Sequence, residues 1–140
     1  MSVSHIDEVT NVYVPVSDQD AARAFFVDSL GFELRVDFRY AGDEHWVEVA
    51  PPGAPTRVAL VPPSDARPLG IETGVGFASR DVDADHAAFR ERGVEVDDIL
   101  REGDPPVRWS GALLAGIPAM FLLRDPDGNS FVVVQAADQA

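Results

Sequence analysis

Three histidines are the first candidates for metal binding or proton transfer in this sequence, because cysteine is absent. They are His5, His45 and His86, which stand far apart and form no H-x-x-x-H or H-x-E pattern. Without cysteine the chain has no disulfide, no thiolate nucleophile and no thiolate-bound zinc. Each histidine is therefore interpreted as a surface or loop residue. His45 keeps one alternative role, as a polar group at the rim of a cavity.

Other stretches that resemble reactive sites lack what those sites require. DVDADH at 81–86 resembles the start of a calcium-binding loop, but it lacks the central glycine and the final glutamate of such a loop. The glycines of LGIETGVGF at 69–77 do not have phosphate-loop spacing. No serine stands in a recognisable nucleophile elbow. The local motifs therefore assign no catalytic residue.

The elements that would position a site occur twice along the chain. With Asp18 placed on Asp81, an offset of 63 residues, VYVPVSDQDAARAFF lies over VGFASRDVDADHAAF. Each copy begins with residues of strand-like alternation, continues with an apolar face at helical spacing and reaches a glycine. The repeat predicts one supersecondary unit that is used twice.

Two helices are expected, over 18–30 and 82–92. Side chains at the start of each can accept the free N–H groups of its first turn: Ser17 or Asp18 in the first helix, and Asp81 or Asp83 in the second. Gly31 and Gly93 follow the helices as left-handed stops. Three extended segments follow each helix, over 33–39, 44–50 and 57–62 in the first copy and over 94–101, 112–124 and 130–136 in the second.

The predicted fold class is α+β, with two βαβββ modules that form a cupped eight-stranded mixed sheet. With 140 residues the chain is expected to be a single domain over 1–140, with module 1 at about 6–63 and module 2 at about 71–137. The net charge of −13 argues against nucleic-acid partners. Neither a secretion signal nor an apolar stretch of membrane-spanning length is found, so we expect a cytoplasmic protein with no membrane partner.

The chain resembles the vicinal oxygen chelate superfamily, which includes glyoxalase I, bleomycin-resistance proteins and extradiol dioxygenases. The resemblance is carried by VPVSDQDAARAFFVDSLGF, DVDADHAAFRERGVEV and FLLRDPDGNSFVVVQ, which cover both repeats. It implies a homodimer and a ligand cavity on a cupped sheet. Family enzymes hold one divalent metal with His and Glu ligands at four strand positions. Those positions correspond here to Asn11, Ala59, Gly74 and Val132, which lack the required donors, so no metal and no cofactor are expected.

Strand alternation predicts which side chains line the cavity. The predicted ligand-binding residues are Asn11, Tyr13, Trp46, Glu48, Trp109, Phe121 and Val132. Leu123 and Val134 are placed on the same side, Gly74, Gly76 and Ala78 leave room there, and Trp109 is expected to be a lid or wall. Glu48 has an alternative role, as a strand residue in a salt bridge to Arg57 or Arg39. Trp46 and Trp109 also have an alternative role, in which they fill space inside the barrel or in the dimer interface.

These features favour a metal-independent protein that binds a small apolar or aromatic ligand, as bleomycin-resistance proteins sequester an antibiotic. Glu48 and the acidic composition predict a preference for a cationic group. The alternative is an enzyme of the glyoxalase, isomerase or dioxygenase kind, a lyase or an oxidoreductase, with Glu48 and Tyr13 in acid–base roles. A third interpretation is an accessory protein that uses the scaffold for dimerisation. The fold by itself does not choose among them.

Overall fold

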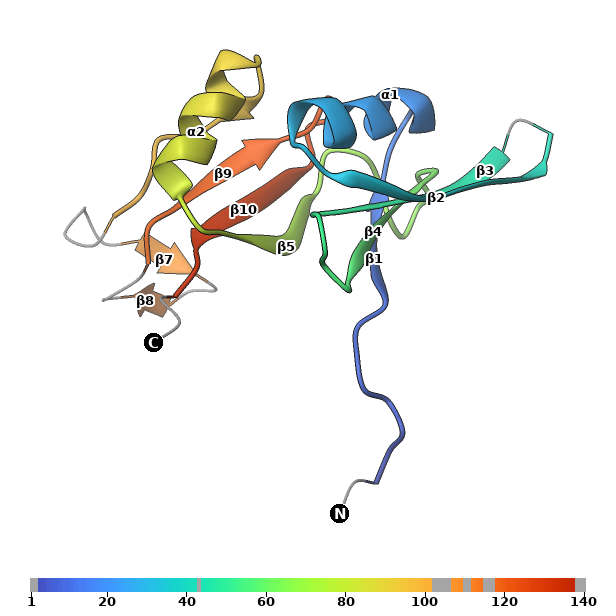
Figure 1. Cartoon of the computed structure of the whole chain (residues 1–140), viewed down its shortest axis with the longest axis horizontal. Coiled ribbons are helices and arrows are strands. Elements are labelled where there is room, and N and C mark those ends of the chain that lie inside the picture. The colour runs from blue at the N-terminus through green and yellow to red at the C-terminus, as the bar shows by residue number, and fades with distance from the viewer. Residues whose placement is uncertain (1–2, 43, 102–106, 110–111, 115–117, 138–140) are drawn as a thin grey trace. The chain divides into compact units, whose positions relative to one another are not determined.

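The chain folds into two compact units, Met1–Leu69 and Gly70–Ala140. The computed structural model describes residues 3–42, 44–101, 107–109, 112–114 and 118–137, with the backbone alone at 41, 107–109 and 112–114. Each unit has one helical segment packed against a four-stranded mixed sheet (Figure 1). Within the described residues, neither helix is long and apolar enough to cross a membrane.

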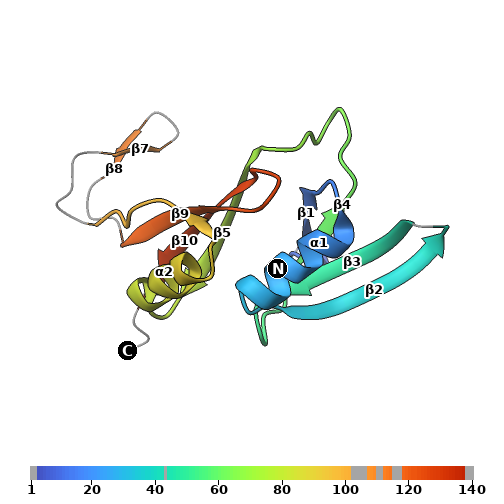
Figure 2. The same ribbon diagram turned by 90° about the horizontal axis from the view of Figure 1, so that it is seen from above.

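The first unit has the predicted order of one strand, one helix and three strands. Its elements are β1 (Asn11–Pro15), α1 (Gln19–Ala24), η1 (Phe25–Ser29, a π-helical turn that continues α1), β2 (Glu33–Ala41), β3 (Glu44–Ala50) and β4 (Arg57–Val61). The strand order is β1-β4-β3-β2, in which β1 and β4 are parallel and the other neighbours are antiparallel. The helix lies along one face of this sheet (Figure 2).

Local sequence chemistry sets the ends of the first helix. The Asp18 carboxylate accepts a hydrogen bond of 3.0 Å from the Ala21 N–H, so Asp18 rather than Ser17 is the cap. Gly31 stops the helix with φ +80°, a conformation that costs glycine no side-chain clash. The buried core lies between the helix and the sheet, and it includes Val14, Phe26, Val47, Val49 and Leu60.

The second unit repeats this arrangement and adds a hairpin. Its elements are β5 (Glu72–Ser79), α2 (Val82–Glu91), β6 (Glu95–Val96), β7 (Val107–Trp109), β8 (Ala112–Leu114), β9 (Met120–Arg124) and β10 (Ser130–Gln135). The sheet order is β5-β10-β9-β6, with β5 and β10 parallel, so each strand corresponds to one in the first unit. β7 and β8 pair with each other as a separate two-stranded sheet.

The DPDGN turn between β9 and β10 has a structural role. Asn129 is fully buried, and its side-chain oxygen accepts hydrogen bonds from the N–H groups of Gly70 and Ile71 at 3.0 and 3.1 Å. Its side-chain amide donates to the Asp125 carboxylate at 2.9 Å. Burial raises the pKa of Asp125. The turn thus ties the start of the second unit to the hairpin that leads into its last strand.

The predicted fold class is confirmed, since the chain is α+β and has two four-stranded mixed sheets. Both helices lie where they were expected, and Asp81 is the second cap, with a bond of 3.0 Å from the Ala84 N–H. One predicted segment is wrong. Residues 112–124 do not form one strand, because β8 pairs with β7 whereas β9 joins the main sheet of the second unit. The single-domain assignment stays a prediction.

Candidate functional site

The sheet of the first unit has one face turned away from its helix. Strand register places side chains from four strands on this face, because Tyr13 and Glu48 both lie opposite Ala59, and Phe38 lies opposite Trp46. We call it the open face and define it by Asn11, Tyr13, Phe38, Trp46, Glu48, Arg57 and Ala59. It contains the four sequence-predicted residues of this unit, Asn11, Tyr13, Trp46 and Glu48.

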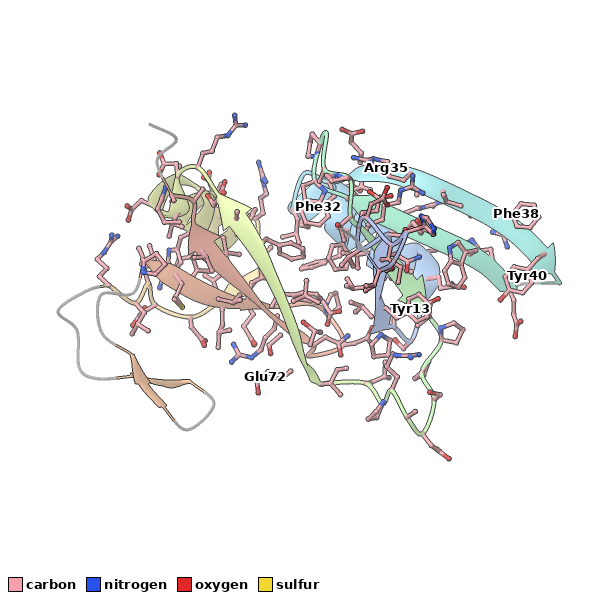
Figure 3. The ribbon with its side chains drawn as sticks, turned by 90° about the horizontal axis from the view of Figure 1, so that it is seen from below. Tyr13, Phe32, Arg35, Phe38, Tyr40 and Glu72 are labelled. Carbon is pink, nitrogen blue, oxygen red and sulfur yellow. The ribbon has the colours of Figure 1, made fainter. Side chains whose placement is uncertain are left out.

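Two aromatic rings form the centre of the open face. Tyr13 and Trp46 meet edge to face, with ring centroids 5.6 Å apart and planes inclined at 81°. Such pairs contribute about 0.5–1.5 kcal/mol beyond the area they bury. Tyr13 is 45% exposed, and Trp46 is half-buried. Figure 3 labels Tyr13 on β1 together with Phe38 and Tyr40 on β2. An exposed pair that is already held in position offers a planar ligand a surface for contact.

Glu48 fixes the orientation of the tryptophan. The Trp46 indole N–H donates to Glu48 Oε2 at 2.5 Å, and Arg57 Nη1 donates to Glu48 Oε1 at 3.3 Å. Glu48 is 6% exposed, and each of its buried oxygens accepts one of these two hydrogen bonds. The salt-bridge interpretation of Glu48 is therefore confirmed with Arg57 as the partner. Arg39 lies opposite His45 in the strand ladder.

A second arginine reaches the open face from outside the sheet. The guanidinium carbon of Arg67 lies 5.1 Å from the centroid of the Tyr13 ring, within the range of a cation–π contact. Arg67 follows β4 in the Pro-rich segment 62–70. Sequence reasoning missed this residue, and Phe38 as well. Alternation along β2 is the signal that could have placed Phe38 on the open face. No local pattern in the sequence indicates that Arg67 folds back over Tyr13.

The second unit also has a face turned away from its helix, where β5 presents small residues. Gly74, Gly76 and Ala78 are exposed on β5, as predicted. Val132 lies beside Gly76, whose added Cβ would come within 3.2 Å of Val132 Cγ1. Gly74 has φ +72° at an irregularity in the β5–β10 register. A small hollow occurs here, lined by Glu72, Gly74, Val75, Leu122, Ser130, Phe131 and Val132.

The predicted orientation of Phe121 and Leu123 is wrong. Phe121 is 2% exposed and packs edge to face against Phe89 and His86 of α2. The register explains the difference, because Leu123 lies opposite Phe131, whose ring stacks on Phe77 in the core. Phe121 is therefore a core residue on the helix side. Trp109 belongs to β7, but its side chain lies outside the described residues, and its role as a lid or wall stays a prediction.

His45 does not lie at a cavity rim. It is 4% exposed, and its Nδ1 lies 2.6 Å from Asp37 Oδ1, while the other oxygen of Asp37 accepts from Arg23 Nη1 at 2.7 Å. The hydrogen bond with His45 lowers the pKa of Asp37 below 3.8. Because His45 alternates with Trp46 along β3, it occupies the opposite face of the sheet. His45 belongs to a structural polar network.

A profile of the Glyoxalase/Bleomycin resistance protein/Dioxygenase superfamily matches residues 3–133. The chain belongs to this superfamily. TnmS3, an antibiotic binding protein from Streptomyces sp. CB03234, is 34% identical, with a TM-score of 0.76 over 96% of this chain and 99% of its own. A superfamily member from Sphaerobacter thermophilus DSM 20745 is 35% identical and has a TM-score of 0.73, with 94% of this chain and 98% of the other chain covered. The uncharacterized protein YetH of Bacillus subtilis (strain 168) is 26% identical over 91% of this chain and 98% of YetH.

The residues at the four metal positions of the superfamily do not fit a metal ion. Asn11 and Ala59 lie on neighbouring strands of the first unit, and Gly74 and Val132 on neighbouring strands of the second. Together they offer one amide oxygen, whereas a catalytic divalent site generally needs at least three protein ligands. Among the residues whose side chains are described, no group of three or more His, Cys, Asp or Glu is placed to hold an ion.

Proposed function

We propose that this protein is a metal-independent binder that sequesters a small aromatic ligand on the open face of its first unit. The observation that carries the proposal is the partly exposed Tyr13–Trp46 pair, whose tryptophan Glu48 holds in position. A rigid aromatic surface loses little conformational entropy when a planar ligand stacks on it. Asn11 adds a side-chain amide for orienting the ligand. The proposal keeps the predictions of a homodimer and a cytoplasmic location.

The likeness to TnmS3 supports a binding role. Its 34% identity extends over 96% of this chain, and TnmS3 is described as an antibiotic binding protein. Sequestration needs affinity and no reactive group, so the donor-poor metal positions do not count against it. The role of Val132 in ligand binding stays a prediction of its own for the second unit, where the glycines of β5 would allow close approach to the backbone.

The alternative is a superfamily enzyme in which Glu48 and Tyr13 transfer protons. It has less support, because both oxygens of Glu48 already accept hydrogen bonds, and the Tyr13 ring lies under Arg67. A catalytic base must reach the proton of the substrate, and these contacts compete with the substrate for both oxygens of Glu48. Elemental analysis of the purified protein separates the two functions. One tightly held zinc, nickel, iron or manganese per chain, lost together with glyoxalase activity on chelation, would establish the enzyme.

Fluorescence of a single tryptophan tests the binding proposal. The chain has two tryptophans, so Trp109→Phe leaves Trp46 as the reporter. We expect saturable quenching of Trp46 when neutral planar compounds such as pyrene-1-methanol are titrated in. In this background Tyr13→Ala should weaken binding, whereas Tyr40→Ala, which removes another exposed tyrosine of the first unit, should not. No saturable quenching by any probe would refute the proposal.

A further inference from the structure

Arg67 is held in a defined turn over the open face. Two backbone hydrogen bonds of 3.0 Å join Ser64 and Arg67 in both directions, which fixes the start of the Arg67 side chain. The residue is half-buried, and its guanidinium lies 5.1 Å from the Tyr13 centroid. Within the described part of the chain, no carboxylate lies within ion-pair distance of Arg67. Among the described residues, its positive charge therefore has no ion-pair partner.

Arg57 brings a second donor to the same face. Its Nη1 is engaged by Glu48, but its Nε is buried and has no hydrogen-bond partner among the described residues. A buried donor without a partner costs free energy, and native proteins rarely leave one unsatisfied. The Arg57 side chain as a whole is 39% exposed, so the guanidinium could turn its unsatisfied donor toward an acceptor atom of a ligand at this end of the face.

The local charge is opposite to that of the whole molecule. Glu48 is paired with Arg57, so within the described residues Arg67 adds one unpaired positive charge beside the aromatic pair, in a chain with a net charge of −13. A cationic ligand would have to compete with Arg67 for the Tyr13 ring and would gain nothing from Glu48. The sequence-based preference for a cationic group therefore loses its basis at this site.

We propose that Arg67, together with Arg57, makes the open face select an aromatic ligand that carries a carboxylate or phenolate. The inference rests on the proposed binding function and names the ligand class of the same site. The ring packs against the edge-to-face pair of Tyr13 and Trp46, while the acidic group accepts hydrogen bonds from the two guanidiniums. Charge-assisted hydrogen bonds of this kind are stronger than neutral ones and give direction as well as affinity.

Three probes with the same ring and different charges test the selectivity. Pyrene-1-carboxylate, pyrene-1-methanol and pyrene-1-methylammonium are titrated into the Trp109→Phe protein and followed by quenching of Trp46. We expect the carboxylate to bind most tightly and the ammonium least. Arg67→Gln should weaken the carboxylate about fivefold, which corresponds to about 1 kcal/mol, and leave the neutral probe nearly unchanged. Arg67→Lys keeps the charge and should retain the order of the probes.

Arg39→Gln is the matched control, because it removes one positive charge from an exposed position on β2 of the same unit. Its carboxylate affinity should stay within the error of the unsubstituted protein. Equal affinity for all three probes, a preference for the ammonium, or an unchanged preference in Arg67→Gln would overturn the selectivity and leave the binding function standing. Failure of all three probes to bind would overturn both.

Discussion

Glu48 is the residue on which the geometry of the open face depends. Its buried carboxylate is the common partner of the Trp46 indole and the Arg57 guanidinium, which come from two strands. A paired charge that is this deeply buried is tolerated because each oxygen has a donor. The same residue therefore contributes both to the stability of the sheet and to the position of the aromatic pair.

Glu48→Gln should lower the free energy of unfolding by about 1 to 3 kcal/mol, because Arg57 loses its counter-charge in a partly buried position. Urea denaturation measures the difference. Glu44→Gln makes the same chemical change at an exposed position of β3 and should have little effect. Equal stability of the Glu48→Gln protein and the unsubstituted protein would show that the pair contributes nothing.

The contact between Asp37 and His45 predicts a dependence of stability on pH. The pKa of Asp37 is lowered below 3.8 by the His45 hydrogen bond, so the folded state favours the charged carboxylate. The stabilisation is present above about pH 4 and is lost as pH falls through the lower, folded-state pKa. Unfolding measured at several pH values should show Asp37→Asn less stable than the unsubstituted protein near neutrality, with the gap closing in acid. A gap that stays constant from neutral pH into acid would contradict this assignment.

At the scale of elements, the two sheets differ in how their faces are built. The first unit presents large aromatic side chains, whereas β5 of the second presents glycine and alanine and carries an irregularity at Gly74. A residue with positive φ at such a point changes the direction of the strand, and glycine adopts this conformation without a side-chain clash. Two separate reasons therefore explain the glycines of β5. Glycine at 74 allows the backbone to adopt a positive φ, and the small residues also leave space on this face.

Gly74→Ala tests the need for a positive φ, and Gly76→Ala tests the need for space. An added Cβ at Gly74 meets nothing within 4 Å, but φ is +72°, so the cost is conformational, at about 1 to 2 kcal/mol. At Gly76 the backbone is ordinary and the Cβ would press on Val132 Cγ1, which can shift on a half-buried surface. Chemical denaturation should therefore rank Gly74→Ala as the more destabilising change. The reverse order would refute the backbone explanation.

At the scale of the whole molecule, the acidic net charge opposes association between copies of the chain, whereas exposed apolar surface favours it. The net charge of −13 makes copies of the chain repel one another. Large apolar side chains are nevertheless exposed on the edge strand β2, where Phe38 is 62% and Tyr40 is 54% exposed (Figure 3). Exposed apolar groups beside a sheet edge are typical of surfaces that a partner covers.

We predict a homodimer that salt strengthens, because screening reduces the repulsion while apolar contacts persist. Light scattering should give twice the 15.1 kDa mass of one chain, with tighter association at higher ionic strength. Phe38→Ser should weaken the association, and Val27→Ser, at a half-buried position of η1, serves as a check on general destabilisation. A mass of one chain at all micromolar concentrations and salt levels would exclude the dimer.

The amino-acid sequence alone predicts the repeated βαβββ order, the two helices with two candidate caps each and their glycine stops, and the open-side placement of Tyr13, Trp46, Glu48 and Val132. These are local properties, because capping depends on neighbouring residues and alternation follows from the strand itself. The family membership followed from the same motifs and is confirmed by the match over residues 3–133.

Tertiary structure decided the features that depend on distant partners. The side on which Phe121 lies follows from the register of β9 against β10, which alternation within β9 does not fix. The burial of His45 depends on Asp37 from the neighbouring strand. Arg67 reaches Tyr13 because the chain beyond β4 turns back over the sheet. A strand pattern gives the period of its side chains, whereas hydrogen-bonded pairing and chain path decide which side chains meet, and so which chemistry the open face presents.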